Sequence, residues 1–364
     1  MSLILDNVSK IVGTETHVYP TDLELSGSTM NVLLGPTLSG KTTLMRLMAG
    51  LDKPSTGKVF WNGEDVTDMR VQDRKVAMVY QQFINYPSMS VYENIASPLR
   101  TAGAHKAEID KAVHETAEML KLTSMLERKP LELSGGQQQR CALARALVKK
   151  AGLVLLDEPL ASLDYKLREE LRVDIPRIFE ESGAIFVYAT TEPEEALLLG
   201  GNTATFCEGH ITQFGPTLQV YRTPVDVTTA RVFSDPPMNL LNIRKEGAQI
   251  YFGHGRTSSL GSSLTALSDG EYIVGFRPNH LELDRHTITA MEFQATLIAT
   301  ELTGSQTFVH LDHDGEHWIG LVRGIRELEI GGVLTTYLDP SHVYIFSRDG
   351  RIVAPAAYAL ANTA

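Results

Sequence analysis

Apolar residues in the first 235 positions gather in short unbroken runs that alternate with stretches of helical periodicity. The clearest runs are Met30–Leu34, Val76–Tyr80, Leu153–Leu156 and Ala184–Ala189. Continuous apolar runs of this length are typical of strands buried on both faces, as in a parallel sheet covered by helices. The pattern therefore predicts an α/β domain for residues 1–235.

A helical insertion is predicted inside this α/β domain, over about residues 87–151. Within it, the segment Lys106–Leu122 carries apolar side chains at spacings of three and four, at Ile109, Val113, Ala117 and Leu120. This spacing places the four side chains on one face of an amphipathic helix.

The pattern changes around the paired prolines Pro236 and Pro237, which indicate a domain boundary. Beyond them, Gly and Asp turns separate short apolar runs, at Tyr272–Phe276, Phe293–Ala299, Thr307–Leu311, His317–Val322 and Val343–Phe346. Short strands with frequent turns predict an all-β domain over residues 236–364, a small barrel of the oligomer-binding (OB) type.

Composition and charge narrow the class of protein. No apolar stretch reaches the roughly 18–20 residues of a membrane-spanning helix, and Met1–Lys10 lacks the layout of a secretory signal, so we expect a cytoplasmic protein. A formal net charge of −11 counts against nucleic-acid binding, which needs cations that neutralise phosphates. Cys141 and Cys207 lack the spacing of a zinc site or of a disulfide framework.

One glycine-rich segment has the pattern GxxxxGK[ST] directly after the apolar run Met30–Leu34 and directly before a helical run. In a strand–loop–helix context, backbone amides of such a loop surround a β-phosphate, the lysine neutralises β/γ oxygens, and the hydroxyl reaches Mg²⁺. The segment predicts an ATP and Mg²⁺ site formed by Gly35, Pro36, Thr37, Leu38, Ser39, Gly40, Lys41, Thr42 and Thr43.

Two carboxylates follow the apolar run Leu153–Leu156, at Asp157 and Glu158. If this strand lies beside the phosphate loop, Asp157 reaches the Mg²⁺ shell and Glu158 can act as the general base that activates water. Taken alone, an acidic turn after a strand is equally consistent with a purely structural role.

The string Leu133-Ser134-Gly135-Gly136-Gln137 opens a second helical run. Its glycines let backbone amides approach an anion, Ser134 adds a hydroxyl donor, and the helix contributes its positive end. The order of phosphate loop, LSGGQ and acidic strand end resembles the nucleotide-binding subunits of ABC transporters, in which LSGGQ is the signature. The resemblance extends over nearly the whole chain.

The resemblance implies a RecA-like cassette in which two subunits pack head to tail, each ATP lying between one phosphate loop and the partner's signature residues Ser134, Gly135, Gly136 and Gln137. It implies that Gln81 lies near Mg²⁺ and the attacking water, and that Ser162–Asp164 communicates between the paired subunits. Residues near Gln81–Glu93 would face membrane permease subunits. Arg277–His280 is similar to a pattern in ATPases of carbohydrate importers, such as the maltose and glycerol-phosphate systems.

From this resemblance we expect an ATPase on the inner face of the cell membrane. It would drive uptake of a carbohydrate or polyol through permeases served by an extracytoplasmic solute-binding protein. A rival hypothesis is a nucleotide-gated subunit that binds ATP while a non-identical cassette supplies most of the hydrolysis. A second rival is an ABC ATPase of repair or translation, which the single cassette and the carbohydrate-type tail disfavour.

The chain departs from the family pattern at Val12, Leu38 and Thr191, where an adenine-stacking aromatic, a glycine and a histidine are usual. His17 or Tyr19 could supply the ring that is missing at Val12. Because threonine can donate one hydrogen bond to a γ-phosphate but carries no charge, we expect a non-identical partner cassette that retains the histidine. GPTLSGKTT with ATTEPEEA looks most like one cassette of the two-ATPase glycerol importers.

Three other segments have simpler interpretations than catalysis. His310 and His317 are predicted on strands that flank a His313-Asp-Gly turn, in preference to a metal cluster. Glu192-Pro-Glu-Glu195 is predicted to start a helix, with its acidic residues favoured by the dipole. Arg168–Arg172 is interpreted as a solvated helix face with i,i+4 pairing.

Overall fold

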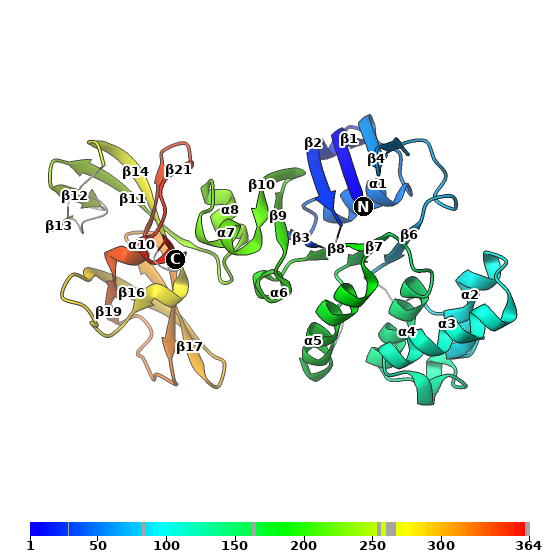
Figure 1. The fold of residues 1–364 in the computed structure, drawn as a ribbon. Helices are drawn as coiled ribbons and strands as arrows, with labels where there is room; N and C mark the ends of the chain where they lie inside the picture. The colour runs from blue at the N-terminus through cyan, green and yellow to red at the C-terminus, as the bar shows by residue number, and fades with distance from the viewer. Residues whose placement is uncertain (28, 82–83, 162–164, 253–255, 260–266, 361–364) are drawn as a thin grey trace. The chain divides into compact units, whose positions relative to one another are not determined.

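The buried apolar runs form a six-stranded sheet in the order β10-β9-β3-β8-β7-β6 in the computed structural model (Figure 1). The structure describes residues 1–27, 29–81, 84–161, 165–252, 256–259 and 267–360. The strands are β3 (Met30–Leu34), β6 (Val76–Val79), β7 (Leu153–Asp157), β8 (Ile185–Thr190), β9 (Asn202–Cys207) and β10 (His210–Pro216). All neighbours pair in parallel except β9 with β10, which confirms the four predicted strands.

A second sheet in the same part of the chain is antiparallel, in the order β2-β1-β4-β5, and sequence reasoning did not anticipate it. Its strands are β1 (Ser2–Val12), β2 (Glu15–Ser26), β4 (Thr56–Trp61) and β5 (Glu64–Asp65). Alternating positions such as Leu3 and Leu5 point inward and are almost fully buried. Together with helix α1 (Lys41–Ala49) and the parallel strands, they form one apolar core.

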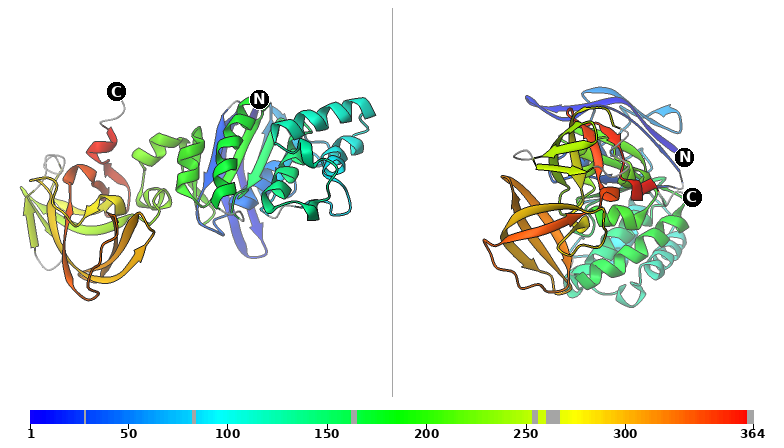
Figure 2. Two further views of the ribbon diagram at one scale, coloured as in Figure 1. Left: turned by 90° about the horizontal axis from the view of Figure 1, so that it is seen from below. Right: turned by 90° about the vertical axis from the view of Figure 1, so that its left-hand side faces the viewer.

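The predicted helical insertion is present as α2 (Val91–Thr101), α3 (Lys106–Met119) and α4 (Gly135–Leu147), joined by the short 3₁₀ turns η1 (Thr123–Met125) and η2 (Pro130–Glu132). The predicted stripe of α3 is buried, at Ile109, Val113, Ala117 and Leu120. Figure 1 and the left view of Figure 2 both show these three helices grouped to one side of the sheets of this unit. Two further helices cover the parallel sheet, α5 (Tyr165–Ser182) and α6 (Pro193–Leu199).

The chain divides into two compact units, Met1–Thr217 and Leu218–Ala364. Residues 218–235, which the sequence interpretation placed in the first domain, pack within the second unit as most of α7 (Thr217–Arg222) and α8 (Val227–Val232). Arg277 explains this packing, because it donates to the carbonyl oxygens of Tyr221 and Phe233 at 2.8 and 2.7 Å.

The second unit is a nearly closed, all-antiparallel barrel, as predicted. One sheet has the order β13-β12-β11-β14-β20-β21 and the other β15-β19-β16-β17-β18. The strands are β11 (Asn239–Glu246), β12 (Gln249–Phe252), β13 (Arg256–Ser259), β14 (Gly270–Phe276), β15 (Leu281–Glu282), β16 (Met291–Leu302), β17 (Gln306–His313), β18 (Glu316–Arg323), β19 (Val333–Leu338), β20 (Tyr344–Ser347) and β21 (Ile352–Ala354). The described residues of this unit also form η3 (Pro278–His280), η4 (Pro340–His342) and α10 (Ala357–Leu360).

The His313-Asp-Gly turn joins β17 to β18 as predicted, with Asp314 and Gly315 both at positive φ. His310 and His317 lie on the two flanking strands, and the His310 ring is hydrogen-bonded to Glu301 at 3.1 Å. Among the described helices, none is long and apolar enough to cross a membrane.

Candidate functional site

The phosphate loop joins β3 to α1 and is fixed at both of its ends. The Gly35 amide donates to the Thr190 carbonyl at 3.2 Å, and the Ser39 carbonyl accepts the Gly209 amide at 2.8 Å. Gly35 has no room for a side chain, because a Cβ there would lie 2.1 Å from the Phe206 carbonyl oxygen. Gly40 has a φ of 109°, a backbone conformation that L side chains rarely adopt.

Leu38 occupies the loop position at which the family resemblance leads us to expect glycine. It nevertheless takes the left-handed conformation, with φ 65°, and its side chain is 99% exposed. This conformation costs a non-glycine residue about 1–2 kcal/mol. No burial within the chain offsets that cost, since the side chain is in solvent. The loop thus reaches its shape without the glycine, at the expense of local strain.

Lys41 is buried at the centre of the loop, with 4% of its side chain exposed. Its ammonium donates to the carbonyls of Gly35 at 2.8 Å and Pro36 at 3.0 Å, and lies 3.6 Å from Oε1 of Glu158. Burial lowers the pKa of Lys41, while the Glu158 carboxylate opposes that shift. A cation in this place suits an anionic phosphate.

Ser39 adds a second feature that fits a phosphate. Its hydroxyl oxygen is buried and has no hydrogen-bond partner in the described part of the chain. A buried polar atom without a partner is costly, and a ligand oxygen at this position would satisfy it.

Thr42 lies in the first turn of α1 and Asp157 at the end of β7, and the two side chains meet directly. The Thr42 hydroxyl donates to the two carboxylate oxygens of Asp157 at 2.9 and 3.1 Å. Burial raises the pKa of Asp157, and the hydrogen bond from Thr42 opposes the rise. A hydroxyl and a carboxylate side by side form the oxygen donor set that Mg²⁺ prefers.

Glu158 and Gln81 form the third part of the site. The Gln81 side-chain amide donates to Oε2 of Glu158 at 3.2 Å. Glu158 has a φ of 44°, and its amide donates to the Ala189 carbonyl at 3.0 Å. Strained residues that the surrounding structure holds in place are frequent at functional sites. The carboxylate is thereby turned towards Lys41 and Gln81.

Most of these residues line one cavity of about 850 Å³, within the size range of ligand sites, whereas the predicted site residues Gly35, Pro36 and Asp157 lie behind its wall. The cavity is bounded by Glu15, Thr16, His17, Tyr19, Thr37, Leu38, Ser39, Gly40, Lys41, Thr42, Thr43, Gln81, Glu158, Glu208 and Gly209. Sequence reasoning missed Glu208 and Gly209, which form the turn between β9 and β10. A Glu-Gly turn carries no chemical signal, so only the fold could place it here.

Rings also line the part of this cavity that is formed by β2. His17 and Tyr19 both contribute, and the Tyr19 ring stacks on His210 with centroids 3.9 Å apart. Val12 is 49% exposed and is not among the cavity-lining residues.

Thr191 is exposed at the end of β8, between the buried Thr190 and the half-buried Glu192. It is not among the residues that line the cavity.

The signature residues lie elsewhere on the first unit, at the start of α4. Ser134 caps the helix, since its hydroxyl accepts the Gln137 amide while its own amide donates to the Gln137 side chain at 3.0 Å. Ser134 and Gly135 are exposed, and a Cβ at Gly135 would meet no described atom within 4 Å. None of Ser134, Gly135, Gly136 or Gln137 lines the cavity around Lys41. The residues 162–164 lie outside the described part of the chain.

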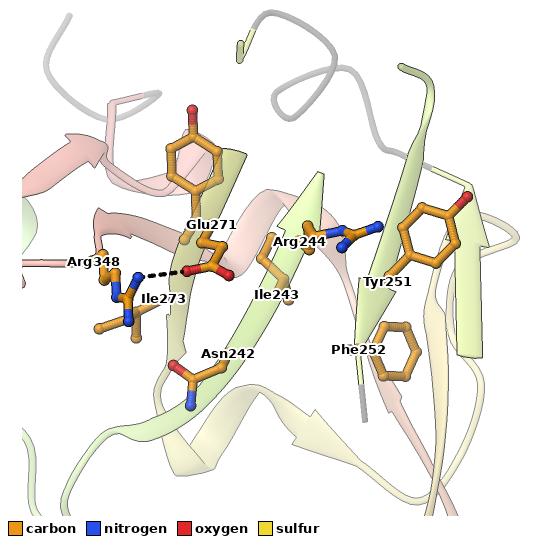
Figure 3. Close-up of a pocket in the computed structure, with 9 residues that line it drawn as sticks. Asn242, Ile243, Arg244, Tyr251, Phe252, Glu271, Ile273 and Arg348 are labelled. Atoms are coloured by element: carbon orange, nitrogen blue, oxygen red, sulfur yellow. Dashed lines mark ion pairs between the residues drawn. The ribbon is translucent and has the colours of Figure 1, made fainter. Parts of the chain in front are cut away.

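A second cavity, of about 720 Å³, lies in the barrel unit on the face of β11, β12 and β14 (Figure 3). Its guanidinium groups already have partners, because Arg348 pairs with Glu271 at 3.1 Å and Arg244 pairs with Glu246. Its described lining residues include no phosphate loop, so we place ATP in the cavity around Lys41.

Comparison with known proteins agrees with this geometry. Residues 19–161 match the family model described as ABC transporter. The trehalose/maltose import ATP-binding protein MalK of Thermococcus litoralis is 35% identical over 360 residues, which cover 94% of this chain and 97% of that protein. This chain belongs to the ABC transporter family. The sn-glycerol-3-phosphate import ATP-binding protein UgpC of Psychromonas ingrahamii is 33% identical to this ABC protein over 362 residues, which cover 96% of this chain and 94% of that protein.

Solved structures show the same cassette fold. The ATP-binding cassette MJ0796, in a dimeric post-hydrolysis state bound to ADP and Pi, superposes with a TM-score of 0.53 at 28% identity. The match covers 59% of this ABC chain and 98% of that cassette. The activity of this chain is therefore that of an ABC ATPase, carried by the first unit.

Proposed function

We propose that this chain is the ATP-hydrolysing subunit of an importer for a carbohydrate or polyol, glycerol and its phosphate among them. One observation carries the proposal: Lys41, Thr42, Gln81 and Glu158 line a single cavity, and Asp157 accepts a hydrogen bond from Thr42 at its wall. The likeness to importer proteins over nearly the whole chain, barrel unit included, supports import in preference to a repair or translation role.

In the proposed reaction, Lys41 and the amides of the phosphate loop hold the β- and γ-phosphates of ATP. Thr42 and Asp157 would hold Mg²⁺, with Gln81 beside them, and the ion would neutralise negative charge on the phosphates. Glu158 takes a proton from water as the water oxygen attacks the γ-phosphorus, and the bond from phosphorus to the ADP oxygen breaks. Gln81 orients that water and is held by Glu158 at 3.2 Å.

The adenine base would contact the rings of β2. A base stacks on aromatic side chains, and His17 and Tyr19 line the cavity while Val12 does not. We propose His17 as the main contact, because one face of Tyr19 is already covered by His210.

A second cassette would complete the site. Within one chain the signature helix start stands apart from the cavity, with Gly135 open to solvent. Ser134, Gly136 and Gln137 would therefore contact the nucleotide held by the phosphate loop of the partner. The solved cassette with a TM-score of 0.53 is dimeric, which supports such pairing.

The partner would be a non-identical cassette that carries a histidine where this chain has Thr191. Glu158 and Gln81 are in place for hydrolysis in this chain, so we favour an active subunit over one that only binds ATP. The pair would sit at the inner face of the membrane against permease subunits that receive solute from an extracytoplasmic binding protein. Purification of tagged chain from membranes, followed by identification of co-purified proteins, tests this composition; recovery of a homodimer without permeases would contradict it.

The catalytic assignment is tested by Glu158→Gln, with Glu194→Gln as the matched control. Glu194 is exposed in the first turn of α6, whereas Glu158 is held against Lys41. We expect Glu158→Gln to bind a fluorescent ATP analogue within about twofold of wild type and to lose turnover about 10²–10⁴-fold. The control should keep its turnover. Undiminished hydrolysis by Glu158→Gln would remove Glu158 from the role of base.

A further inference from the structure

Thr191 is flanked by two residues that are fixed by side-chain contacts. On its N-terminal side, the Thr190 hydroxyl accepts the Glu192 amide at 3.0 Å and donates to Oε2 of Glu195 at 2.6 Å. The backbone here also anchors the catalytic groups. The Thr190 carbonyl accepts the Gly35 amide, and the Ala189 carbonyl accepts the Glu158 amide.

Glu195 is the buried anchor of this turn, with 6% of its side chain exposed. Its carboxylate also accepts the Tyr188 hydroxyl at 3.0 Å and lies 3.7 Å from the Arg172 guanidinium. Burial raises the pKa of Glu195, and the hydroxyl donors and Arg172 oppose the rise. Glu195 therefore does more than complement the helix dipole, which is the role that its sequence position indicated.

Glu192, on the C-terminal side of Thr191, is held by two arginines of α5. One carboxylate oxygen is 2.8 Å from Arg168 and the other is 2.8 Å from Arg172. Arg172 also pairs with Glu169 at 2.7 Å, and only 13% of its side chain is exposed. The solvated helix face predicted for Arg168–Arg172 is thus wrong for the two arginines, which are turned inward onto the segment that carries Thr191, although Glu170 between them is exposed. Both α5 and α6 lie below β8 as drawn in Figure 1.

We propose that Arg168, Arg172, Glu192 and Glu195, called here the α5–α6 clamp, are positioning residues for ATP hydrolysis. The clamp fixes the backbone on both sides of Thr191, and the carbonyls of Thr190 and Ala189 in this segment hold the amides of Gly35 and of the general base Glu158. Through the two arginines, the clamp also connects the segment that carries Thr191 to helix α5. The proposal rests on the function proposed above.

Packing alone does not account for this arrangement. Buried ion pairs add little net stability, because desolvation offsets most of their attraction, and apolar contacts would join α6 to the sheet as well. What the charges supply is geometric specificity: both arginines contact Glu192 on one side of Thr191, and Glu195 accepts the hydroxyl of Thr190 on the other. A displacement of about 1 Å in a positioned group can lower turnover about 10²-fold.

The test compares Glu192→Ala and Glu192→Gln with the exposed control Glu194→Gln, in full-length chain purified with its partner subunits. We expect Glu192→Ala to lower kcat about 10- to 100-fold, while KM for MgATP and the affinity for a fluorescent ATP analogue stay within about twofold. Glu192→Gln keeps an oxygen acceptor for the arginines and should recover part of kcat. Thermal unfolding of each variant is recorded alongside.

A kcat within about twofold of wild type for Glu192→Ala would overturn the clamp. So would a loss of kcat that is matched by loss of nucleotide affinity and of thermal stability, because that pattern marks a merely structural role. If Glu158→Gln abolishes turnover while Glu192→Ala does not change it, the clamp fails and the proposed function stands. If wild-type chain in its assembly hydrolyses no ATP, both fail.

Discussion

Two glycines of the first unit make a matched pair for testing how the site is built. At Gly35, a Cβ would lie 2.1 Å from the Phe206 carbonyl oxygen and 3.0 Å from the Ser39 hydroxyl. At Gly135, a Cβ would meet no described atom within 4 Å. The same substitution, glycine to alanine, therefore forces a backbone shift at the phosphate loop and none at the signature helix.

The expected magnitudes follow from these distances. An approach of 2.1 Å lies far inside favourable contact near 3.5 Å, so the loop must move by about 1 Å or more. Strain of this kind destabilises by about 1–3 kcal/mol, and misplacement of the loop should weaken nucleotide binding and turnover about 10²-fold. Gly135→Ala should leave the stability of the chain unchanged or raise it by up to about 1 kcal/mol, since alanine favours helix.

The two variants should differ in the property that they lose, which shows when nucleotide binding and ATP turnover are measured in separate experiments. Gly35→Ala should lose affinity for a fluorescent ATP analogue in the lone chain, whereas Gly135→Ala should keep it. In the purified assembly Gly135→Ala should still lose turnover about tenfold or more, because its Cβ enters the space proposed for the nucleotide of the partner. The reasoning is refuted if Gly35→Ala binds nucleotide normally, or if Gly135→Ala turns over at the wild-type rate.

Three further predictions concern the base and the barrel unit. His17→Ala should weaken ATP binding about 5- to 100-fold and leave inorganic tripolyphosphate binding unchanged, as measured by calorimetry; equal losses for both ligands would exclude a base contact. Arg277→Ala leaves one buried and one partly buried carbonyl unpaired and should destabilise the barrel by about 3 kcal/mol in denaturant unfolding, while Arg348→Ala, at an exposed position, shifts it by less than about 0.5 kcal/mol; a small shift for Arg277 would contradict this. Burial, with smaller contributions from His342 and Arg277, lowers the pKa of His280 to about 3 from 6.5. Between about pH 6.5 and 3, the unfolded chain binds a proton at His280 that the folded barrel does not bind, so the free energy of unfolding should fall as the pH drops through this range. His280→Phe should reduce this dependence of stability on pH, and an unchanged dependence would contradict the assignment.

The sequence predicts those parts of the site that depend on a local motif or on the rule that parallel strands of one sheet end at the same edge. The phosphate loop is fixed by its strand–loop–helix context, and Asp157 meets Thr42 because β3 and β7 run parallel on either side of β8 and end at the same edge of the sheet. The sequence analysis does not predict the antiparallel sheet, although Gly13-Thr14 separates two alternating runs, because short strands at this point also fit an α/β domain with a single sheet.

Other features depend on contacts between residues that are distant in sequence. Arg168 and Arg172 match a solvated helix face, and only the fold shows that their partner is Glu192, 24 and 20 residues away. The sequence shows that Leu38 stands where the family usually has glycine, but it does not show which backbone conformation the loop adopts there. The structure shows that the backbone keeps the left-handed conformation and that the side chain is exposed.

The central claim is that nucleotide is gripped between the phosphate loop of one cassette and the signature helix of its partner. Its most direct test uses the slow-turnover variant Glu158→Gln, purified with its partner cassette and sedimented with and without MgATP. MgATP should convert separate cassettes into a closed pair, and adding Gly135→Gln should prevent closure while each phosphate loop still binds nucleotide. A closed pair that forms equally well with glutamine at position 135 would contradict the claim.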